Sequence, residues 1–382
     1  MVSLDDKRFY SYDSVYFDVV KYFKELFGVL GEMASDELML SLASWRLQKT
    51  LPKSIDVGRI RKHVLLFWRK GWLKSTILRV FSDLLPNFIR KTFLSDASRQ
   101  SLTGSAVGDK FKPPEFKVND IIIIPEMTSI FDNFDSKFIG AFLTALEEGR
   151  IAVSYVKFSN LSEEEIVDAF GEYEIVIRNG RIEYDVDSVV WCGAHTYATL
   201  ERHLRDAFID RFTVVSPEPD VFNNEFVNKV LGFKRDLSFE ISLRANIEKK
   251  LNSIKFDIDD YNYIFSIVKE VCSDFYQPIS PRFISEVQKT GVSFYAWNDT
   301  ASKSEIVEYI TDKIIKYSKA SIPVDDKMVS LLRSRPVSVD ELKEFSDYGF
   351  TDIYKFLKRI GAKPITRGNV TKYYLDEIKY DV

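Results

Sequence analysis

The sequence predicts an α/β fold with a parallel sheet and largely helical segments on either side of it. Short, uniformly apolar runs typical of buried parallel strands occur at 63–68 (HVLLFW), 120–124 (DIIII) and 187–194 (DSVVWCGA). Segments with apolar residues three and four positions apart, the pattern of amphipathic helices, alternate with these runs. Alternation of this kind through 63–217 favours an α/β domain.

The first elements are helical. VYFDVVKYFKELFGVL and DELMLSLASWRL carry apolar residues at helical spacing, and Pro52 ends the pattern. The strand at 63–68 then leads through FWRKGWLKST into KSTILRVFSDLL, an amphipathic helix that ends before Pro86. Strand, loop and helix in this order are the context that a phosphate-binding loop requires.

The middle of the chain alternates strands and helices. DKFKPPEFKV (109–118) predicts a proline-bearing loop, and DIIIIPE predicts a buried strand with a carboxylate at its carboxyl end. FDSKFIGAFLTALEEGR predicts a helix stopped by Gly149. EYEIVIRNGRIEYDV predicts two strands around Asn179 and Gly180, a preferred dipeptide of tight hairpin turns. LERHLRDAFIDRF (200–212) is expected to be helical, and TVVSP to form the next strand.

The rest of the chain is mostly helical. Four helical patterns fill 234–320, and Pro323 marks a linker. KMVSLLRSR, VDELKEFS and TDIYKFLKRI then predict three short helices, and KPITRGNVTKYYL predicts two strands around Arg367, Gly368 and Asn369. This is the order of elements in a winged helix-turn-helix.

Composition limits the classes of function. The 382 residues include 53 basic and 57 acidic ones, a net charge of −4. That balance argues against a protein that coats nucleic acid over its whole surface, but it allows local basic patches. Cys192, Cys272 and the three histidines show no metal-ligand spacing, so neither a disulfide framework nor a structural zinc is expected. Without a membrane-length apolar stretch or a signal peptide, the chain is expected to be soluble and cytoplasmic.

Two segments carry the residues of a candidate nucleotide site. Phosphates bind where backbone N–H groups, a helix N-terminus, a lysine and a hydroxyl for magnesium converge, and Lys74 and Ser75 supply the last two. In DIIIIPE, Glu126 stands where a phosphate-loop ATPase places the carboxylate that polarises the attacking water. Taken singly, a KST triplet is common by chance, and the strand end is equally compatible with an ordinary turn.

Six segments, taken in order, resemble the AAA+ module of the minichromosome maintenance (MCM) family of replicative helicases. The order and spacing match over roughly residues 40–300, and a winged helix follows as in that family. The segments are RIRKHVLLFWRKGWLKSTILRVFSDLLP, SLTGSAVGD, VNDIIIIPEMTSIFDNFDSKFIGAFLTALEEGRIAVSYV, DSVVWCGAHT, LRDAFIDRFTVV and SPRFISEVQKTGVSFYAW. The resemblance implies a helical N-terminal extension (1–50), an AAA+ α/β core (51–232), a helical lid (233–320) and a winged helix (324–382).

The resemblance also implies ATP and Mg²⁺ as cofactors. Glu126 would be the catalytic base and would hold Mg²⁺ together with Ser75. The residues of the loop assigned to ATP are Gly71, Lys74, Ser75 and Thr76.

Three further ATPase roles follow from the resemblance. The sensor-1 side chain, which orients the attacking water, would be His195 or Thr196. Arg211 would be the arginine finger that reaches the ATP of a neighbouring subunit, and Arg282 would be the second sensor. Taken alone, each arginine would be better explained as an ordinary surface residue, Arg211 at a helix end and Arg282 at a helix N-terminus.

DNA is the partner that the resemblance implies. The family has a hairpin before sensor 1 that projects basic residues into a central channel, and here Arg178 and Arg181 flank the tip at Asn179. Such a tip can hold a DNA phosphate whatever the base sequence. Many surface hairpins, however, carry arginines and bind nothing. Lys157 is a further candidate.

The winged helix would bind duplex DNA through basic residues of its recognition helix and wing. The alternative is a winged helix that binds protein, which the acidic Asp340 and Glu341 on the preceding helix favour. The basic residues are Lys355, Lys358 and Arg359 on the helix, and Lys363, Arg367 and Lys372 on the wing.

The chain also departs from the family. Leu73 occupies the position of the glycine before the loop lysine, Pro125 replaces the aspartate before Glu126, and the N-terminal zinc-bearing domain is missing. Two hypotheses therefore stand. One is a ring-forming, hexameric DNA-dependent ATPase that acts as a replicative helicase or translocase of a small genetic element. The other is a catalytically degenerate AAA+ initiator or scaffold that binds DNA.

Overall fold

The computed structural model describes residues 14–51, 60–68, 70–94, 104–107, 110–127, 136–154, 162–171, 173–178, 181–195, 211–217, 232, 234–273, 281–320, 328, 331–332, 335–345, 350–367 and 370–375.

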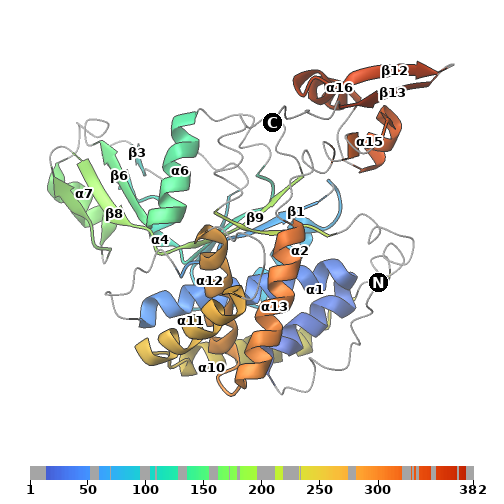
Figure 1. Cartoon of the computed structure of the whole chain (residues 1–382). Helices are drawn as coiled ribbons and strands as arrows, with labels where there is room; N and C mark the ends of the chain where they lie inside the picture. The colour runs from blue at the N-terminus through green and yellow to red at the C-terminus, as the bar shows by residue number, and fades with distance from the viewer. Residues whose placement is uncertain are drawn as a thin grey trace.

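A five-stranded sheet in the order β10-β1-β9-β5-β2 forms the centre of the molecule (Figure 1). Every neighbouring pair in it is parallel. The three predicted buried strands are confirmed as β1, β5 and β9, all of whose residues are buried, and TVVSP supplies β10. The strands span Val64–Phe67 (β1), Lys91–Phe93 (β2), Ile121–Ile124 (β5), Val189–Ala194 (β9) and Thr213–Val215 (β10).

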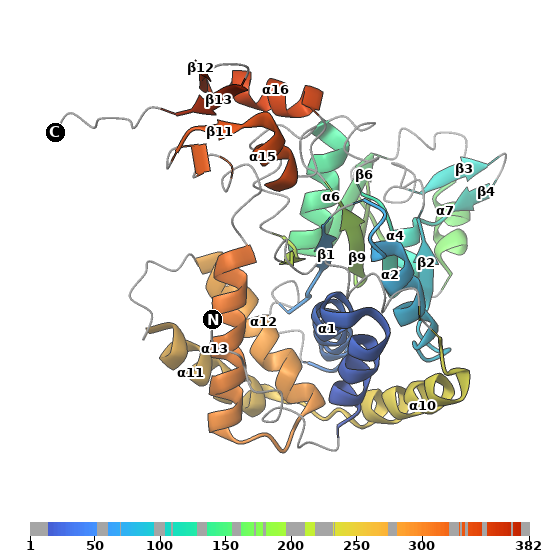
Figure 2. The ribbon, with the colours of Figure 1, turned by 90° about the vertical axis from the view of Figure 1, so that its right-hand side faces the viewer.

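Helices from both ends of the chain cover one face of this sheet (Figures 1 and 2). The longest, α1, begins at Ser14, whose hydroxyl accepts a hydrogen bond from the Tyr16 amide, and it has one non-helical residue, Gly28. A single apolar cluster joins α1, the sheet, α2 and the helices of the 234–320 region. These helices are α1 (Val15–Thr50), α2 (Lys74–Asp83), α10 (Leu237–Ser253), α11 (Ile258–Ser273), α12 (Pro281–Trp297) and α13 (Lys303–Ala320).

A second apolar cluster covers the opposite face of the sheet. It packs α6 and a small antiparallel sheet, in the order β6-β8-β7, against β1, β5 and β9. The predicted hairpin is confirmed, because Arg178 on β7 lies opposite Arg181 on β8. The sequence reasoning had no helix at α7. The elements are α6 (Ser136–Glu148), β6 (Arg150–Ser154), α7 (Glu163–Phe170), β7 (Val176–Arg178) and β8 (Arg181–Asp185).

The predicted loop at 109–118 is wrong. Lys110–Lys112 forms β4, which pairs antiparallel with β3 (Ser105–Val107), and Glu115–Val118 forms the short helix α4. Pro114 is the N-cap of α4. Proline restricts the interior of a helix but suits its start, where an amide donor is not needed, so the prolines mark a helix entry here.

The C-terminal residues form a small unit with its own core, centred on Leu342, Ile353 and Phe356. Its sheet has the order β11-β13-β12 and is antiparallel. Its elements are β11 (Val337–Ser338), α15 (Val339–Phe345), α16 (Phe350–Arg359), β12 (Lys363–Arg367) and β13 (Val370–Tyr374).

Buried charges tie the helical layer to the sheet. Lys62, just before β1, is fully buried, and its Nζ lies 3.2 Å from Glu37 Oε2 on α1 and 2.9 Å from Thr290 Oγ1 on α12. Lys313 on α13 forms ion pairs with both Asp36 and Glu37. Opposite charges offset one another here, which is the arrangement that makes buried charges tolerable.

No helix in the described part of the chain is long and apolar enough to cross a membrane.

Candidate functional site

The carboxyl ends of β1, β5 and β9 bring several predicted residues to one edge of the sheet. Open α/β sheets bind ligands at this edge. Lys74 is the first residue of α2, directly after the loop that follows β1, and only 5% of it is exposed. Glu126 follows β5, and His195 follows β9, the strand between β1 and β5. Strand order thus places the lysine and the carboxylate on either side of β9.

Gly193, on β9, makes this approach possible. A Cβ at this position would lie 2.6 Å from the Pro125 carbonyl oxygen and 3.4 Å from Lys74 Cβ. The Gly193 carbonyl also accepts a 2.6 Å hydrogen bond from the Met127 amide. Sequence reasoning missed this residue. Its signal was a glycine inside an otherwise apolar strand, which often marks a close approach of backbone.

The loop itself adopts the backbone of a glycine-containing loop. Leu73, the N-cap of α2, has φ 65° and ψ 0°, in the left-handed region. It is the one non-glycine residue with positive φ among those described, and Gly71 nearby has φ 81°. A leucine in this region is disfavoured by roughly 1–2 kcal/mol relative to ordinary helical geometry. Leu73 thus keeps the left-handed conformation that glycine would adopt without this cost.

Two tryptophans hold the loop. The Trp68 indole Nε1–H donates a 2.6 Å hydrogen bond to the Trp72 carbonyl, and Trp68 is 5% exposed. The Lys74 ammonium donates a 2.5 Å hydrogen bond to the Trp68 carbonyl and lies 5.8 Å from the centroid of the Trp68 ring. The lysine therefore points back into the loop, where an anionic phosphate would compete with a backbone carbonyl for its ammonium group.

Ser75 and Thr76 are exposed in the first turn of α2. The Ser75 hydroxyl donates a 3.5 Å hydrogen bond to the Pro125 carbonyl oxygen. Pro125 therefore presents a carbonyl oxygen near the serine, where the resemblance leads one to expect an aspartate carboxylate. Both kinds of oxygen are ligands that Mg²⁺ accepts, but the carbonyl brings no negative charge.

Glu126 and His195 lie together at the same edge. His195 Nδ1 is 3.3 Å from Glu126 Oε2, and the two side chains are 21% and 36% exposed, respectively. A carboxylate next to an imidazole can both accept a proton and hold a water molecule in place. Of the two sensor-1 candidates, His195 is thus beside Glu126, and Thr196 lies outside the described residues.

Cys192 lies near His195 in the sequence, but its thiol is unreactive. It is fully buried on β9, and burial, followed by the nearby Glu126 charge, raises the pKa of its thiol well above the ordinary value. A protonated thiol is a poor nucleophile, so Cys192 does not add a covalent step to this site.

The two predicted arginines are placed differently. Arg211, just before β10, forms an ion pair with Glu147 of α6 in the same chain, and its side chain is 15% exposed. Arg282 lies in the first turn of α12, and its side chain falls outside the described part. Arg211 is thus paired within its own chain, and the finger role of Arg211 and the second-sensor role of Arg282 stay predictions.

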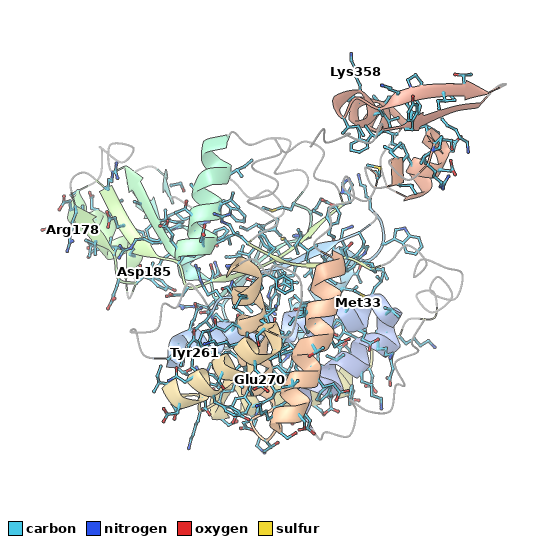
Figure 3. The ribbon with its side chains drawn as sticks, in the orientation of Figure 1. Met33, Arg178, Asp185, Tyr261, Glu270 and Lys358 are labelled. Atoms are coloured by element: carbon cyan, nitrogen blue, oxygen red, sulfur yellow. The ribbon has the colours of Figure 1, made fainter. Side chains whose placement is uncertain are left out.

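The predicted DNA-binding residues lie in two places (Figure 3). Arg178 and Arg181 are exposed at the end of the hairpin, and Lys355 and Lys358 are exposed on α16. On the wing, Lys363 is exposed, and the Lys372 ammonium lies 3.8 Å from a Glu341 carboxylate oxygen. The candidates that lie in part or whole outside the described residues are Lys157, Asn179, Arg359 and Arg367.

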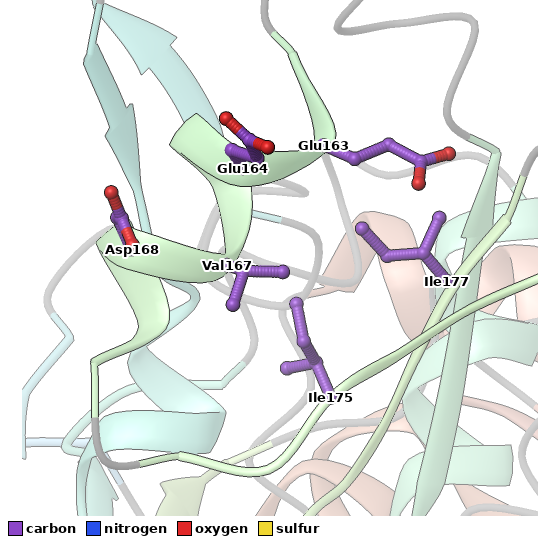
Figure 4. Close-up of a pocket in the computed structure, with 6 residues that line it drawn as sticks. All are labelled: Glu163, Glu164, Val167, Asp168, Ile175 and Ile177. Atoms are coloured by element: carbon purple, nitrogen blue, oxygen red, sulfur yellow. The ribbon is translucent and has the colours of Figure 1, made fainter.

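A pocket of about 340 Å³ lies between α7 and the segment that enters β7 (Figure 4). It combines three carboxylates with an aliphatic floor. Its lining residues are Glu163, Glu164, Val167, Asp168, Ile175 and Ile177. Within the described ranges, no three His, Cys, Asp or Glu side chains gather as a metal site.

Comparison with known proteins gives a distant structural likeness. No protein-family model matches the chain, and no curated protein matches it. One solved structure that it is similar to is a full-length MCM homologue from Methanopyrus kandleri, with 13% sequence identity and a TM-score of 0.46. The similarity covers 80% of this chain and 59% of that one, so the chain spans about three-fifths of that protein's length. At this TM-score the likeness supports no argument about function.

Proposed function

We propose that this chain is a DNA-dependent AAA+ ATPase that assembles into a ring, a hexamer, and acts as a replicative helicase or translocase of a small genetic element. The observation that carries the proposal is the close approach of Lys74, at the start of α2, and the Pro125 carbonyl, the residue before Glu126, on either side of Gly193. A buried lysine at a helix N-terminus is suited to phosphate, and a carboxylate at the adjacent strand end is suited to activating water.

The residues present fit ATP and Mg²⁺ with one ligand fewer than the resemblance implies. Lys74 would neutralise phosphate charge, and the exposed Ser75 hydroxyl would hold Mg²⁺. Bound Mg²⁺ would neutralise the charge that develops on the phosphates. Glu126 would accept the proton of the attacking water, and His195, 3.3 Å away, would orient either the water or the carboxylate.

A ring would complete the site. Arg211 would act in a neighbouring subunit, which requires it to leave Glu147, its partner in this chain. Basic Arg178 and Arg181 would hold one DNA strand through phosphates, and the C-terminal unit would be a winged helix with α16 as its recognition helix. Because the Arg211 side chain is 15% exposed and Glu147 is 47% exposed, Arg211 would have to give up a partly buried ion pair to reach a neighbouring site.

The test is ATP turnover with and without single-stranded DNA. Wild-type protein should hydrolyse ATP faster with DNA, whereas Lys74→Ala and Glu126→Gln should both lose turnover. Glu126→Gln should still bind ATP, because the amide keeps the shape but cannot take a proton. No wild-type turnover above the Lys74→Ala background would eliminate the helicase hypothesis. A protein that stays monomeric with ATP would eliminate the role of Arg211 in a neighbouring site.

A second function, a DNA-binding initiator or scaffold without turnover, is favoured by the loop itself. Leu73 holds a conformation suited to glycine, and Lys74 is engaged with the Trp68 carbonyl. Both features oppose rapid exchange of a phosphate group. This function predicts that the chain assembles on DNA and that Lys74→Ala assembles equally well, which sedimentation with DNA would measure.

A further inference from the structure

The face of α16 that points away from its core is aromatic as well as basic. Ile353, Phe356 and Leu357 face the core and are at most 2% exposed, whereas Phe350 is 46% exposed and Tyr354 is 52% exposed. Residues four apart share one face of a helix, so these two rings stand one turn apart on the outer surface. Large exposed aromatic pairs of this kind point to a binding surface.

The aromatic surface continues from the helix onto the hairpin. The rings of Tyr354 and Tyr373, the latter on β13, form an edge-on pair with centroids 6.3 Å apart. Tyr373 also packs against the core of the C-terminal unit. Tyr354 is therefore held by a neighbour that is itself anchored, which gives its ring a fixed orientation while half of its surface stays open.

Lysines surround these rings. The Lys343 ammonium lies 4.3 Å from the centroid of Phe350, and Lys355 and Lys358 are exposed on the same helix. Glu341 of the preceding helix, an acidic residue that favoured a protein partner, is turned to its own unit: it accepts from the Ser338 amide and pairs with Arg335 at 2.7 Å. Asp340 of α15 is exposed, but on α16 itself the exposed Lys355 and Lys358 favour a polyanion.

We propose that Phe350 and Tyr354 form a stacking platform for the unpaired bases of a single-stranded nucleic acid, with Lys355 and Lys358 on its phosphates. The proposal rests on the DNA-binding part of the proposed function and replaces duplex reading by α16 with single-strand binding. Aromatic side chains stack on unpaired bases irrespective of sequence, whereas the base faces of a duplex are already stacked and hidden. A helix that reads base edges in a groove of duplex DNA would be better served by polar side chains than by two exposed aromatic rings.

The experiment uses the full chain without ATP. The chain carries Arg178→Ala and Arg181→Ala, which remove the hairpin as a competing DNA site. Fluorescence anisotropy would compare a 20-nucleotide oligo-dT strand with an abasic strand of equal length and with a 20-base-pair duplex. Because stacking on one side chain is worth about 5- to 150-fold in affinity per base, oligo-dT should bind at least about 5-fold more tightly than the abasic strand.

Two variants separate stacking from charge. Phe350→Ala/Tyr354→Ala should bind both strands equally, and Tyr354→Trp should keep the preference for bases. The matched control, Lys355→Ala/Lys358→Ala, should weaken both strands by the same factor and lower the salt slope of log K by about 1.4, for two lost phosphate contacts. Circular dichroism would verify that each variant is folded.

Three results would overturn the proposal. They are equal binding of oligo-dT and the abasic strand before the aromatic residues are changed, a preference for bases that survives Phe350→Ala/Tyr354→Ala, and tighter binding of the duplex than of oligo-dT. Absence of binding to all three DNAs would also overturn it and favour a protein partner for this face. Because no nucleotide is present, a failure of ATP turnover leaves this measurement unaffected, and the two proposals fail separately.

Discussion

Leu73 offers a test in which the usual order of two substitutions is reversed. At an ordinary helical position, glycine is less stable than alanine by about 1 kcal/mol. Leu73 has φ 65°, where a Cβ costs roughly 1–2 kcal/mol and glycine has no such cost. Glycine has a freer unfolded chain, which costs it about 0.4–1 kcal/mol relative to alanine. Both substitutions remove the packing of the leucine side chain equally. Leu73→Gly should therefore be about 0.5–1 kcal/mol more stable than Leu73→Ala.

Urea denaturation followed by circular dichroism would measure the free energy of unfolding of both variants. Arg79, exposed in the second turn of α2, is the matched control, because its glycine variant should be less stable than its alanine variant by about 1 kcal/mol. If Leu73→Ala proves at least as stable as Leu73→Gly, the left-handed geometry of this residue is refuted. The same pair also bears on function, since Leu73→Gly should bind nucleotide at least as tightly as wild type.

Three other predictions concern stability. His63 is fully buried; its Nδ1 accepts from the Val190 amide at 3.0 Å, and Nε2 lies 3.2 Å from the Leu146 carbonyl. Burial, followed by the charge of Arg61, lowers its pKa well below the ordinary value. The folded state thus binds fewer protons, and stability present above about pH 6.5 should be lost below it, by up to about 1.4 kcal/mol per pH unit. His63→Gln, which keeps an acceptor and a donor, should flatten that slope in urea denaturation between pH 5 and 7. Asp120→Ala should lower the free energy of unfolding by about 2–3 kcal/mol, because the buried carboxylate of Asp120 lies 2.5 Å from the Lys49 ammonium and accepts from the Arg90 amide at 2.9 Å. A decrease below about 1 kcal/mol would contradict this. Lys313→Ala should lower the free energy of unfolding by about 3–5 kcal/mol, because it removes the cation that Asp36 and Glu37 share. The control Lys303→Ala, at an exposed ion pair, should leave the urea midpoint nearly unchanged.

Strands β1, β5 and β9 of the main sheet were accessible to sequence reasoning because they are nearly pure apolar runs. Ile121–Ile124 needs no partner to be recognised as a buried strand, and Asn179-Gly180 identifies a hairpin by itself. The elements that were missed are short or depend on neighbours. β2 (Lys91–Phe93) is a strand because its backbone pairs with β5, and its three residues carry no pattern of their own. β4 was hidden for the same reason.

The candidate site was predictable in its residue types but not in its contacts. Lys74 and Glu126 could be expected at one sheet edge from the order of strands and loops. The role of Gly193 required strand order, because the glycine matters only when β9 lies between β1 and β5. The contact of His195 with Glu126 joins residues 69 positions apart, and no periodicity reports such a distance.

The buried charges show most clearly what a single sequence conceals. Asp36 and Glu37 lie mid-helix in α1, and their partner Lys313 is 277 and 276 residues away, respectively. In sequence, such charges are typical of a solvated helix face, and the segments that carry them were assigned to an N-terminal extension and a lid. Yet Lys62, at the entrance to β1, is bound to the same carboxylate as Lys313. Because separating these groups would leave charges unpaired in a low-dielectric interior, α1, α13 and the base of β1 are expected to move together. If the chain forms the proposed ring, a conformational change at the phosphate loop should therefore be transmitted between subunits, through the proposed contacts of Arg211 and the hairpin, in preference to a hinge within the helical layer.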